Sequence, residues 1–472
     1  MKTESQTAIQ TTPRSLRFLL AAAIVYIPNQ SHVPDFSVTG LNLTNLLFIA
    51  LVALVALVIG HKATPKTPPA PTPLKKEFIF FFLVLVWGFL VGQLHGASTT
   101  LADFQVLKNC ILYMLFYFLA YHAVRDTKTI KFLFFVILFT TFLDTYLGLR
   151  QAMDYGFNFN AARRVAAPFS WNSSDANRSS AFYTIYLTLM GVTALYYRSS
   201  RTVRWAALAC LAFGIFVNFF TYSRQSYGIL AALALILAFR RNALLAAVVV
   251  VALFNYNLWL PHAAITRIDM TLQTKAPPPG ESAASLNEQI TASSDGRFII
   301  WGGAAKLIEH NPWGIGLNHF DRDIGTYAPA YAHEDANNYY VLCATEDGIL
   351  APIAMLLLML GLYRLGRSVD KLDDGQDSTI YGLGLWLAVI AIALVNIYGS
   401  RFVDGNLMTN FWIFAGMVAR YRAMVLEARA REPQTSTCDN RPATPANRTP
   451  RPTSGPVTAR WAQSGEPQNA HP

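Results

Sequence analysis

Charged residues are scarce in this chain of 472 residues. Asp, Glu, Lys and Arg together make up 14% of it, against about a quarter of an ordinary soluble domain. Hydrophobic residues make up 53%, and they fall in runs of about 20, the length that crosses the hydrocarbon core of a bilayer. This composition excludes a disordered protein and argues against a soluble enzyme. It predicts an all-α integral membrane protein.

Cysteine is also rare, with four in the whole chain. Cys110, Cys210, Cys343 and Cys438 are far apart in sequence, and none forms a Cys-x-x-Cys pair. This spacing argues against a disulfide framework and against a zinc or redox site. The acidic pairs Asp321/Asp323 and Glu334/Asp335 form no recognisable metal motif. We therefore expect no metal and no other cofactor.

Twelve apolar segments are candidate membrane spans. They lie at about 16–28, 43–60, 77–94, 104–123, 130–149, 180–197, 204–222, 226–239, 243–260, 338–363, 379–398 and 406–420. The basic start and short first segment would also suit a signal peptide. No small-x-small cleavage site follows it, which favours an uncleaved first helix.

Lysine and arginine alternate with these spans along the chain. If the N-terminus is cytoplasmic, 26 of the 38 Lys and Arg residues fall in cytoplasmic segments, as the positive-inside rule requires. The net charge of +10 therefore reflects membrane orientation, and we expect no nucleic-acid partner. The expected order is a cytoplasmic N-tail (1–15), nine spans (16–260), an outer loop (261–337), three spans (338–420) and a disordered cytoplasmic tail (421–472).

The long loop at 261–337 contains a predicted helix. Loops of this length are usually functional or disordered. Apolar residues that follow Asp295 at helical spacing predict an amphipathic helix, which ends near Asn311 and carries Arg297 and Trp301 one turn apart. We expect this helix to lie at the outer surface and to hold Arg297 over a cavity. The alternative is that Arg297 is an ordinary charged loop residue that pairs with an acid such as Asp323.

Three segments, in order, resemble the O-antigen ligase and O-antigen polymerase superfamily of bacterial membrane glycosyltransferases. The first is TYSRQS at 221–226, and the second is Gly296–Trp301 with HNPWGIG at 310–316. The third is HEDANNYY at 333–340, followed by Glu-Asp-Gly at 346–348. The segment APFSWN at 167–172, with Asn177, also resembles a family element.

The resemblance implies a GT-C-like bundle of about twelve helices in the bacterial inner membrane, with a long periplasmic loop between helices 9 and 10. It implies an enzyme that needs no metal. The enzyme would transfer a glycan from an undecaprenyl-diphosphate-linked donor to a hydroxyl of an acceptor glycan or of lipid A core. A polymerase of O-antigen or exopolysaccharide repeat units, using the same donor, is the alternative. A transporter or a scaffold for polysaccharide assembly is a remoter one.

The leaving diphosphate requires positive charge, and the planar fork of arginine suits phosphate. Arg224 and Arg297 are the first candidates for this role, followed by Arg163 or Arg164. His333 is the candidate to take the proton of the acceptor hydroxyl, because a neutral histidine suits a general base. The predicted supporting residues are Trp301, Asn337, Asn338, Tyr339 and Glu346.

The identity of a catalytic histidine stays open at this point. Aligning Glu346 and Gly348 with the family pattern places Asn337 at the position of the family histidine, four residues after His333. If a helix begins at or before His333, both side chains would face the same cavity. His310 is expected to cap its own helix, and no motif supports His319.

Overall fold

The computed structural model describes residues 11–33, 42–60, 72–95, 100–157, 163–171, 175–262, 264–266, 268 and 284–431. Their regular elements are helices, and none of the described residues forms a strand. The helices up to Glu427 belong to one compact unit, and the contacts described below lie within it. Residues 1–10 of the predicted N-tail, residues 61–71 of the predicted cytoplasmic connection at 61–76, residues 269–283 of the long loop and the tail after Arg431 lie outside the described residues.

The α-helices are α1 (Arg14–Tyr26), α2 (Leu43–Gly60), α3 (Lys75–Leu94), α4 (Thr100–Ala123), α5 (Thr127–Asp154), α6 (Ala176–Tyr196), α7 (Arg201–Phe219), α8 (Arg224–Arg241), α9 (Ala243–Phe254), α11 (Ala284–His310), α12 (Phe320–Asp323), α13 (Tyr339–Glu346), α14 (Leu350–Asp370), α15 (Gly375–Val395) and α16 (Gly405–Arg431). Short 3₁₀ helices lie at Gln30–His32, Tyr256–Leu258, Ile324–Thr326 and Pro329–Tyr331. Each predicted span overlaps one of these helices.

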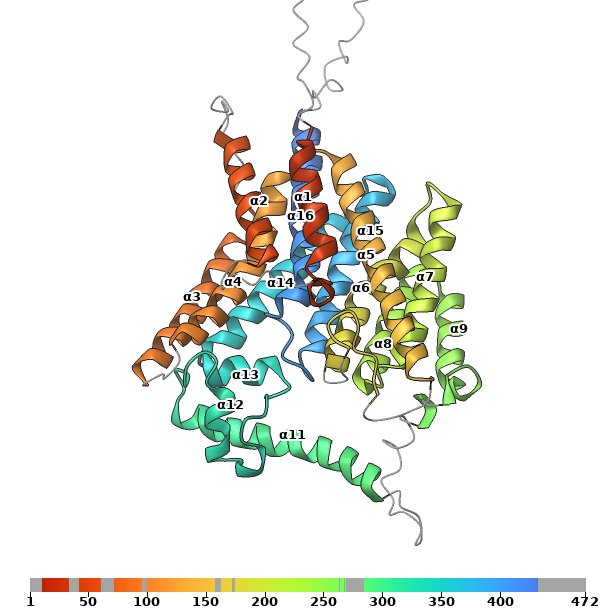
Figure 1. Ribbon diagram of the computed structural model, residues 1–472. Coiled ribbons are helices and arrows are strands. Elements are labelled where there is room, and N and C mark those ends of the chain that lie inside the picture. Colours follow the sequence, from red (N-terminus) through yellow and green to blue (C-terminus); the bar gives the residue numbers. More distant parts are fainter. Residues whose placement is uncertain are drawn as a thin grey trace, which may run out of the picture. The chain divides into compact units, whose positions relative to one another are not determined.

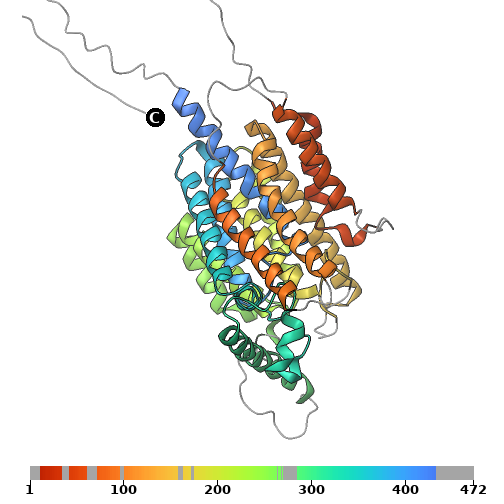
Figure 2. The same ribbon diagram turned by 90° about the vertical axis from the view of Figure 1, so that its left-hand side faces the viewer.

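Successive helices run in alternating directions (Figures 1 and 2). At one end, Thr12 N, just before α1, donates to Asp126 Oδ2 at 2.9 Å, just before α5. At the same end Arg240 of α8 donates to Asp370 of α14 at 2.8 Å. At the other end, which we call the loop end, α11 lies across the bundle (Figure 1). Where the connection is short, as between α4 and α5 or between α8 and α9, the neighbouring helices must be antiparallel.

The core of the bundle is formed by α6, α15 and α16. Along α6 almost every side chain is buried, and Trp412 and Phe414 of α16 are also buried. In α6 the hydroxyl of Tyr186 donates to Leu407 O of α16 at 2.7 Å, so the polar end of this aromatic ring is satisfied inside the apolar core. These three helices form the frame on which the loop end is built.

Six of the described helices are long and apolar enough to cross a membrane: α3, α4, α5, α7, α14 and α15. The apolar helices α2 and α9 are shorter. Large apolar side chains on the outside of the bundle are exposed, for example Leu83 at 61%, Trp205 at 68% and Leu244 at 76%. An outer surface of this kind suits lipid rather than water. The twelve-span topology stays a prediction.

One predicted span is interrupted, and the last helix is longer than predicted. The segment predicted as one span at 338–363 is divided into α13 and α14 by a break at Asp347–Ile349. Gly348 lies in this break with a φ of +89°, a conformation that favours glycine. The last helix, α16, continues to Arg431, beyond the predicted end at residue 420.

The break between α13 and α14 receives the segment that follows α11. Ile349 N donates to Pro312 O at 3.1 Å, and Gly316 N donates to Glu346 O at 3.0 Å. The same segment lies against α3, where Leu317 N donates to Gly88 O at 3.1 Å. The backbone from Pro312 to Leu317 therefore connects α11 to both α3 and α13.

Glycine permits this close approach. A Cβ atom on Gly316, whose φ is +117°, would lie 2.4 Å from Gly92 Cα of α3. A Cβ atom on Gly314, whose φ is +99°, would lie 2.4 Å from Glu346 O. Both glycines of the Gly-Ile-Gly segment at 314–316 are thus required by backbone conformation and by contact.

We expect Gly316→Ala to lower the free energy of unfolding of the loop end by about 2 kcal/mol or more, because it adds left-handed strain to a backbone clash. Limited proteolysis and thermal unfolding of the detergent-solubilised protein measure this. Gly302→Ala on α11 is the matched control, since nothing lies within 4 Å of its added Cβ and alanine favours a helix by about 1 kcal/mol. Equal stability of the two variants would contradict the assigned contact.

Candidate functional site

Three segments that are far apart in sequence meet at the loop end. The first is the turn Thr221–Ser223 before α8, in which Tyr222 has a φ of +50°. The second is the middle of α11, and the third is the stretch 333–338 before α13. They are the three segments that carry the sequence resemblance.

Arg224 and Arg297 come together there. Arg224 is the first residue of α8, and Arg297 lies on α11; both are half-buried. Burial and then the neighbouring Arg224 guanidinium lower the pKa of Arg297. Arginine nevertheless keeps its charge. Two like charges that are partly removed from water repel each other, and an anion between them would relieve this repulsion.

Arg164 is held next to the Arg224 turn. Its Nε donates to Thr221 O at 2.8 Å, and its Nη2 donates to Asn177 Oδ1 at 2.7 Å. Arg164 thus joins the start of α6 to the turn before α8. Arg163 is exposed, so of the two predicted alternatives only Arg164 is built into the site by these contacts.

Trp301 connects α11 to the stretch before α13. Its Nε1 donates to Ala336 O at 2.8 Å, and its ring lies 6.4 Å from the ring of Tyr398, centroid to centroid. The guanidinium carbon of Arg297 lies 5.9 Å from the centroid of the same Tyr398 ring, a distance at which a cation is attracted to the ring. Trp301 and Tyr398 therefore position the helix turn that carries Arg297.

The stretch that contains His333 and Asn337 is not helical. The described helix begins only at Tyr339, and both His333 and Asn337 have positive φ values, +69° and +50°. The one-turn relation that would place both side chains on the same helix face is therefore absent. His333 is exposed, and its backbone N donates to Asp321 O at 2.8 Å.

Asn337 forms a turn with Asp335 along this stretch. Its Nδ2 donates to Asp335 O at 3.1 Å. The Asp335 carboxylate interacts electrostatically with Arg297 and accepts a hydrogen bond from Ser400 Oγ at 3.0 Å. The Asp335 carboxylate therefore places one negative charge near Arg297. Its hydrogen bond from Ser400 joins this turn to the connection between α15 and α16.

The other predicted supporting residues hold the backbone in place. Asn338 caps α13, since its Oδ1 accepts from Tyr340 N at 2.9 Å and from Val341 N at 3.2 Å. Tyr339 is buried, and its N donates to Asn396 O at 3.0 Å. Glu346 is 8% exposed and accepts from Phe320 N at 3.1 Å. These contacts make them positioning residues.

His310 and His319, the other two histidines considered from the sequence, have separate environments. His310 ends α11, where its Nδ1 lies 2.7 Å from Lys306 O, as expected of a residue at a helix end. His319 is 1% exposed, and its Nε2 lies 3.4 Å from Asp103 Oδ2 of α4. Asn318 Nδ2 donates to the other oxygen of Asp103 at 3.0 Å. His319 therefore contributes to holding the loop on α4.

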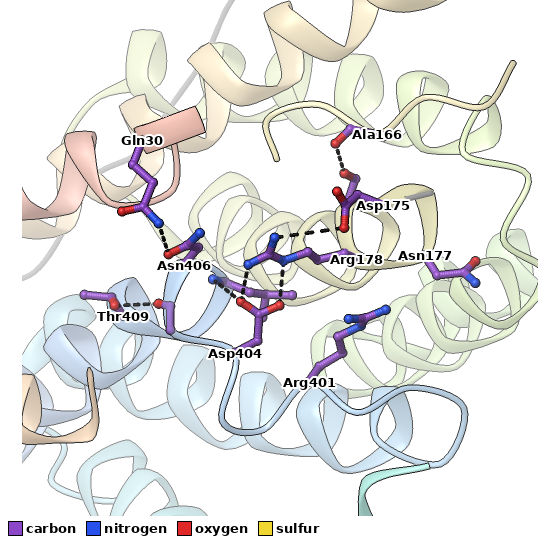
Figure 3. Close-up of polar contacts among 12 residues, drawn as sticks. Gln30, Ala166, Asp175, Asn177, Arg178, Arg401, Asp404, Asn406 and Thr409 are labelled. Atoms are coloured by element: carbon purple, nitrogen blue, oxygen red, sulfur yellow. Dashed lines mark hydrogen bonds and ion pairs between the residues drawn. The ribbon is translucent and has the colours of Figure 1, made fainter. Parts of the chain in front are cut away.

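At the loop end, a bidentate ion pair joins α6 to the residues just before α16 (Figure 3). Arg178 of α6 donates through Nε and Nη2 to the two carboxylate oxygens of Asp404, each at 2.6 Å. The Arg178 guanidinium also lies 4.5 Å from the ring centroid of Phe169. The pair ties the start of α6 to the connection that precedes α16.

Tyr398 and Ser400 join the candidate site without having been singled out from the sequence, and Asp335 had been considered only as a possible metal ligand. They follow or precede helix ends, and no residue pattern distinguishes them from other loop residues. Tyr398 reaches Arg297 from the α15–α16 connection, and Asp335 reaches it from the stretch before α13, where it also accepts from Ser400. Within the described residues no group of three or more His, Cys, Asp or Glu side chains is arranged to hold a metal ion.

Comparison of the chain with models of known protein families gives no match, and comparison with curated proteins gives none at the level of significance applied.

Proposed function

We propose that this chain transfers a glycan from an undecaprenyl-diphosphate-linked donor to an acceptor hydroxyl, in the manner of an O-antigen ligase. The observation that supports this most strongly is the convergence of Arg224, Arg297 and Arg164 at the loop end. A lipid diphosphate is an anion of matching chemistry, and arginine binds phosphate oxygens in pairs. The acceptor is a glycan or lipid A core.

In the proposed reaction the acceptor oxygen attacks the anomeric carbon of the donor sugar. The bond from that carbon to the phosphate oxygen breaks, and the electron pair leaves with the lipid diphosphate. Arg224 and Arg297 stabilise the charge that develops on this leaving group. The hydroxyl proton passes to a base, for which His333 is the proposed residue. No residue in this scheme requires a metal.

We further propose that the bundle crosses the bacterial inner membrane twelve times and that the loop end faces the periplasm. The alternation of the described helices supports this, because it places most basic connections at the end opposite α11. Arg125, Arg198, Arg240 and Arg367 all lie at that end. Positive charge of this kind is retained on the cytoplasmic side.

Cysteine labelling tests this orientation. In a background without the native cysteines, Thr326→Cys at the loop end should react with a membrane-impermeant maleimide in intact spheroplasts. Lys371→Cys at the opposite end should react only after lysis. Both positions are exposed, so access depends on the membrane. The reverse pattern would place the arginines in the cytoplasm and would overturn the proposed reaction.

Conservative substitution tests the arginines. Arg224→Lys and Arg297→Lys keep the charge but lose the planar fork. We expect each to reduce glycan transfer by about tenfold or more, since hydrogen bonds to charged groups contribute about 1.5–3 kcal/mol. The measurement is product formed in a strain that lacks the native chain, with protein level followed by immunoblot. Unchanged transfer in both variants would show that they serve only loop packing.

His333→Ala separates a base from a backbone role. If His333 takes the hydroxyl proton, the variant should lose transfer by about 10²–10⁴-fold and still bind the lipid-linked donor. Asn337→Ala is the comparison, because Asn337 occupies the position of the family histidine. Full transfer by His333→Ala together with an inactive Asn337→Ala would assign the role to Asn337, and transfer would then depend on electrostatic positioning.

The alternative is a polymerase of O-antigen or exopolysaccharide units, which uses the same donor and differs in acceptor. Cells without the chain distinguish the two, because loss of a ligase leaves full-length polymer on the carrier and loss of a polymerase leaves single repeat units. A transporter is the remoter alternative, and the buried acid Asp144 of α5 is the observation in its favour. The clustered arginines at the loop end favour an anion-binding catalyst over it. A non-catalytic scaffold would retain product formation in the arginine variants.

A further inference from the structure

The connection between α15 and α16 is fixed by hydrogen bonds at both sides. Arg401 N donates to Asn396 Oδ1 at 2.9 Å, while Asn396 O accepts from Tyr339 N at 3.0 Å at the start of α13. Ser400 Oγ donates to Asp335 at 3.0 Å. The backbone at Arg401 is therefore set by the same stretch that contacts Arg297.

The Arg401 side chain has an unusual environment on this fixed backbone. Its Nε is buried and has no hydrogen-bond partner among the described residues. The nearby acid Asp404 is already occupied by both arms of Arg178. Figure 3 shows the Arg401 guanidinium beside that pair, directed toward the first turn of α6, which carries Asn177. A buried cationic donor without an acceptor lowers the stability of the folded protein.

The surroundings of Arg401 are the candidate site. Asn177 accepts from Arg164, and Arg164 in turn holds the turn before Arg224. On the other side, Tyr398 lies three residues before Arg401 and contacts Arg297. Four arginines from four separate chain segments are thus connected by contacts around one end of the bundle. Asp335 is the acid that these contacts place beside them, so positive charge exceeds negative charge.

We propose that Arg401 binds the second phosphate of the lipid-linked diphosphate, while Arg224 and Arg297 bind the first. The proposal rests on the proposed function and adds a residue that discriminates a diphosphate from a monophosphate carrier. Its Nε and Nη atoms present parallel donors, which suit two oxygens of one phosphate. An acceptor from the ligand would then satisfy the buried Nε.

The test compares binding of two lipids by the purified full-length protein in nanodiscs. The probes are undecaprenyl diphosphate and undecaprenyl monophosphate, and the variants are Arg401→Gln and Arg401→Lys. We expect both variants to bind the diphosphate about 10- to 100-fold more weakly than the wild type does, the range that a charged hydrogen-bonding contact contributes, and to bind the monophosphate unchanged. Arg150→Gln, at an exposed position on α5 near the loop end, is the control and should bind both lipids normally.

Other outcomes separate this inference from the proposed function. If Arg224→Lys weakens diphosphate binding and Arg401→Gln does not, Arg401 is no ligand and the proposed function stands. If Arg401→Gln weakens the binding of both lipids equally and also lowers the unfolding temperature of the protein, Arg401 has a structural role and the inference is wrong. If the wild type binds the two lipids equally, the discrimination assigned to Arg401 is absent. If it binds neither, both the inference and the proposed function fail.

Discussion

The backbone contact between Pro312–Leu317 and the helices α3 and α13 is the constraint on which the loop end depends. α11 ends at His310, so the position of its C-terminal half is set by where the next residues are attached. Those residues form hydrogen bonds to Gly88 O and Glu346 O, and glycine at 314 and 316 is what allows the backbones to approach. Without this attachment Arg297 would have no fixed distance from Arg224.

The backbone attachment of Pro312–Leu317 does not by itself offset the repulsion between the guanidinium groups of Arg224 and Arg297. Burial and repulsion both oppose the charge on Arg297, and part of that cost is offset by the Tyr398 ring and by the Asp335 carboxylate. The protein uses packing and backbone hydrogen bonds from three segments to keep the arrangement together. Such preorganised positive charge is what a diphosphate leaving group requires, because no reorganisation is needed when the negative charge develops.

Polar residues at the loop end therefore fall into two groups with different physical roles. Arg178 with Asp404, and Asp103 with His319 and Asn318, have their partners within the chain and join helices to loops. Arg401 instead leaves a buried donor without a partner among the described residues. The first group makes the frame rigid, and a site for an anion can only be made from charge that the frame does not neutralise.

The all-helical class and the approximate helix positions could be predicted from the sequence, which also named Arg224, Arg297 and Trp301 as candidates that the structure brings to one end of the bundle. Apolar runs of membrane-crossing length, basic connections and a helical spacing of Arg297 and Trp301 are local properties, and they do not depend on which segments meet. The end of α11 could also be expected from local sequence, because Pro312 cannot continue a helix and the glycines at 314 and 316 favour a turn.

Which of these residues lie together depends on contacts between distant segments. The division of the predicted span at Gly348 arises because Pro312 O and Trp313 O occupy the space beside it, a contact between segments 35 residues apart at Gly348 and Trp313. The same holds for Asp335 and Tyr398, whose place beside α11 follows from electrostatic and ring contacts with Arg297 and Trp301. The stretch at His333 and Asn337 is irregular rather than helical because its backbone bonds to Asp321 and Trp301 instead of to its own next turn. Local pattern cannot specify such pairings, since their free energy belongs to two distant segments at once.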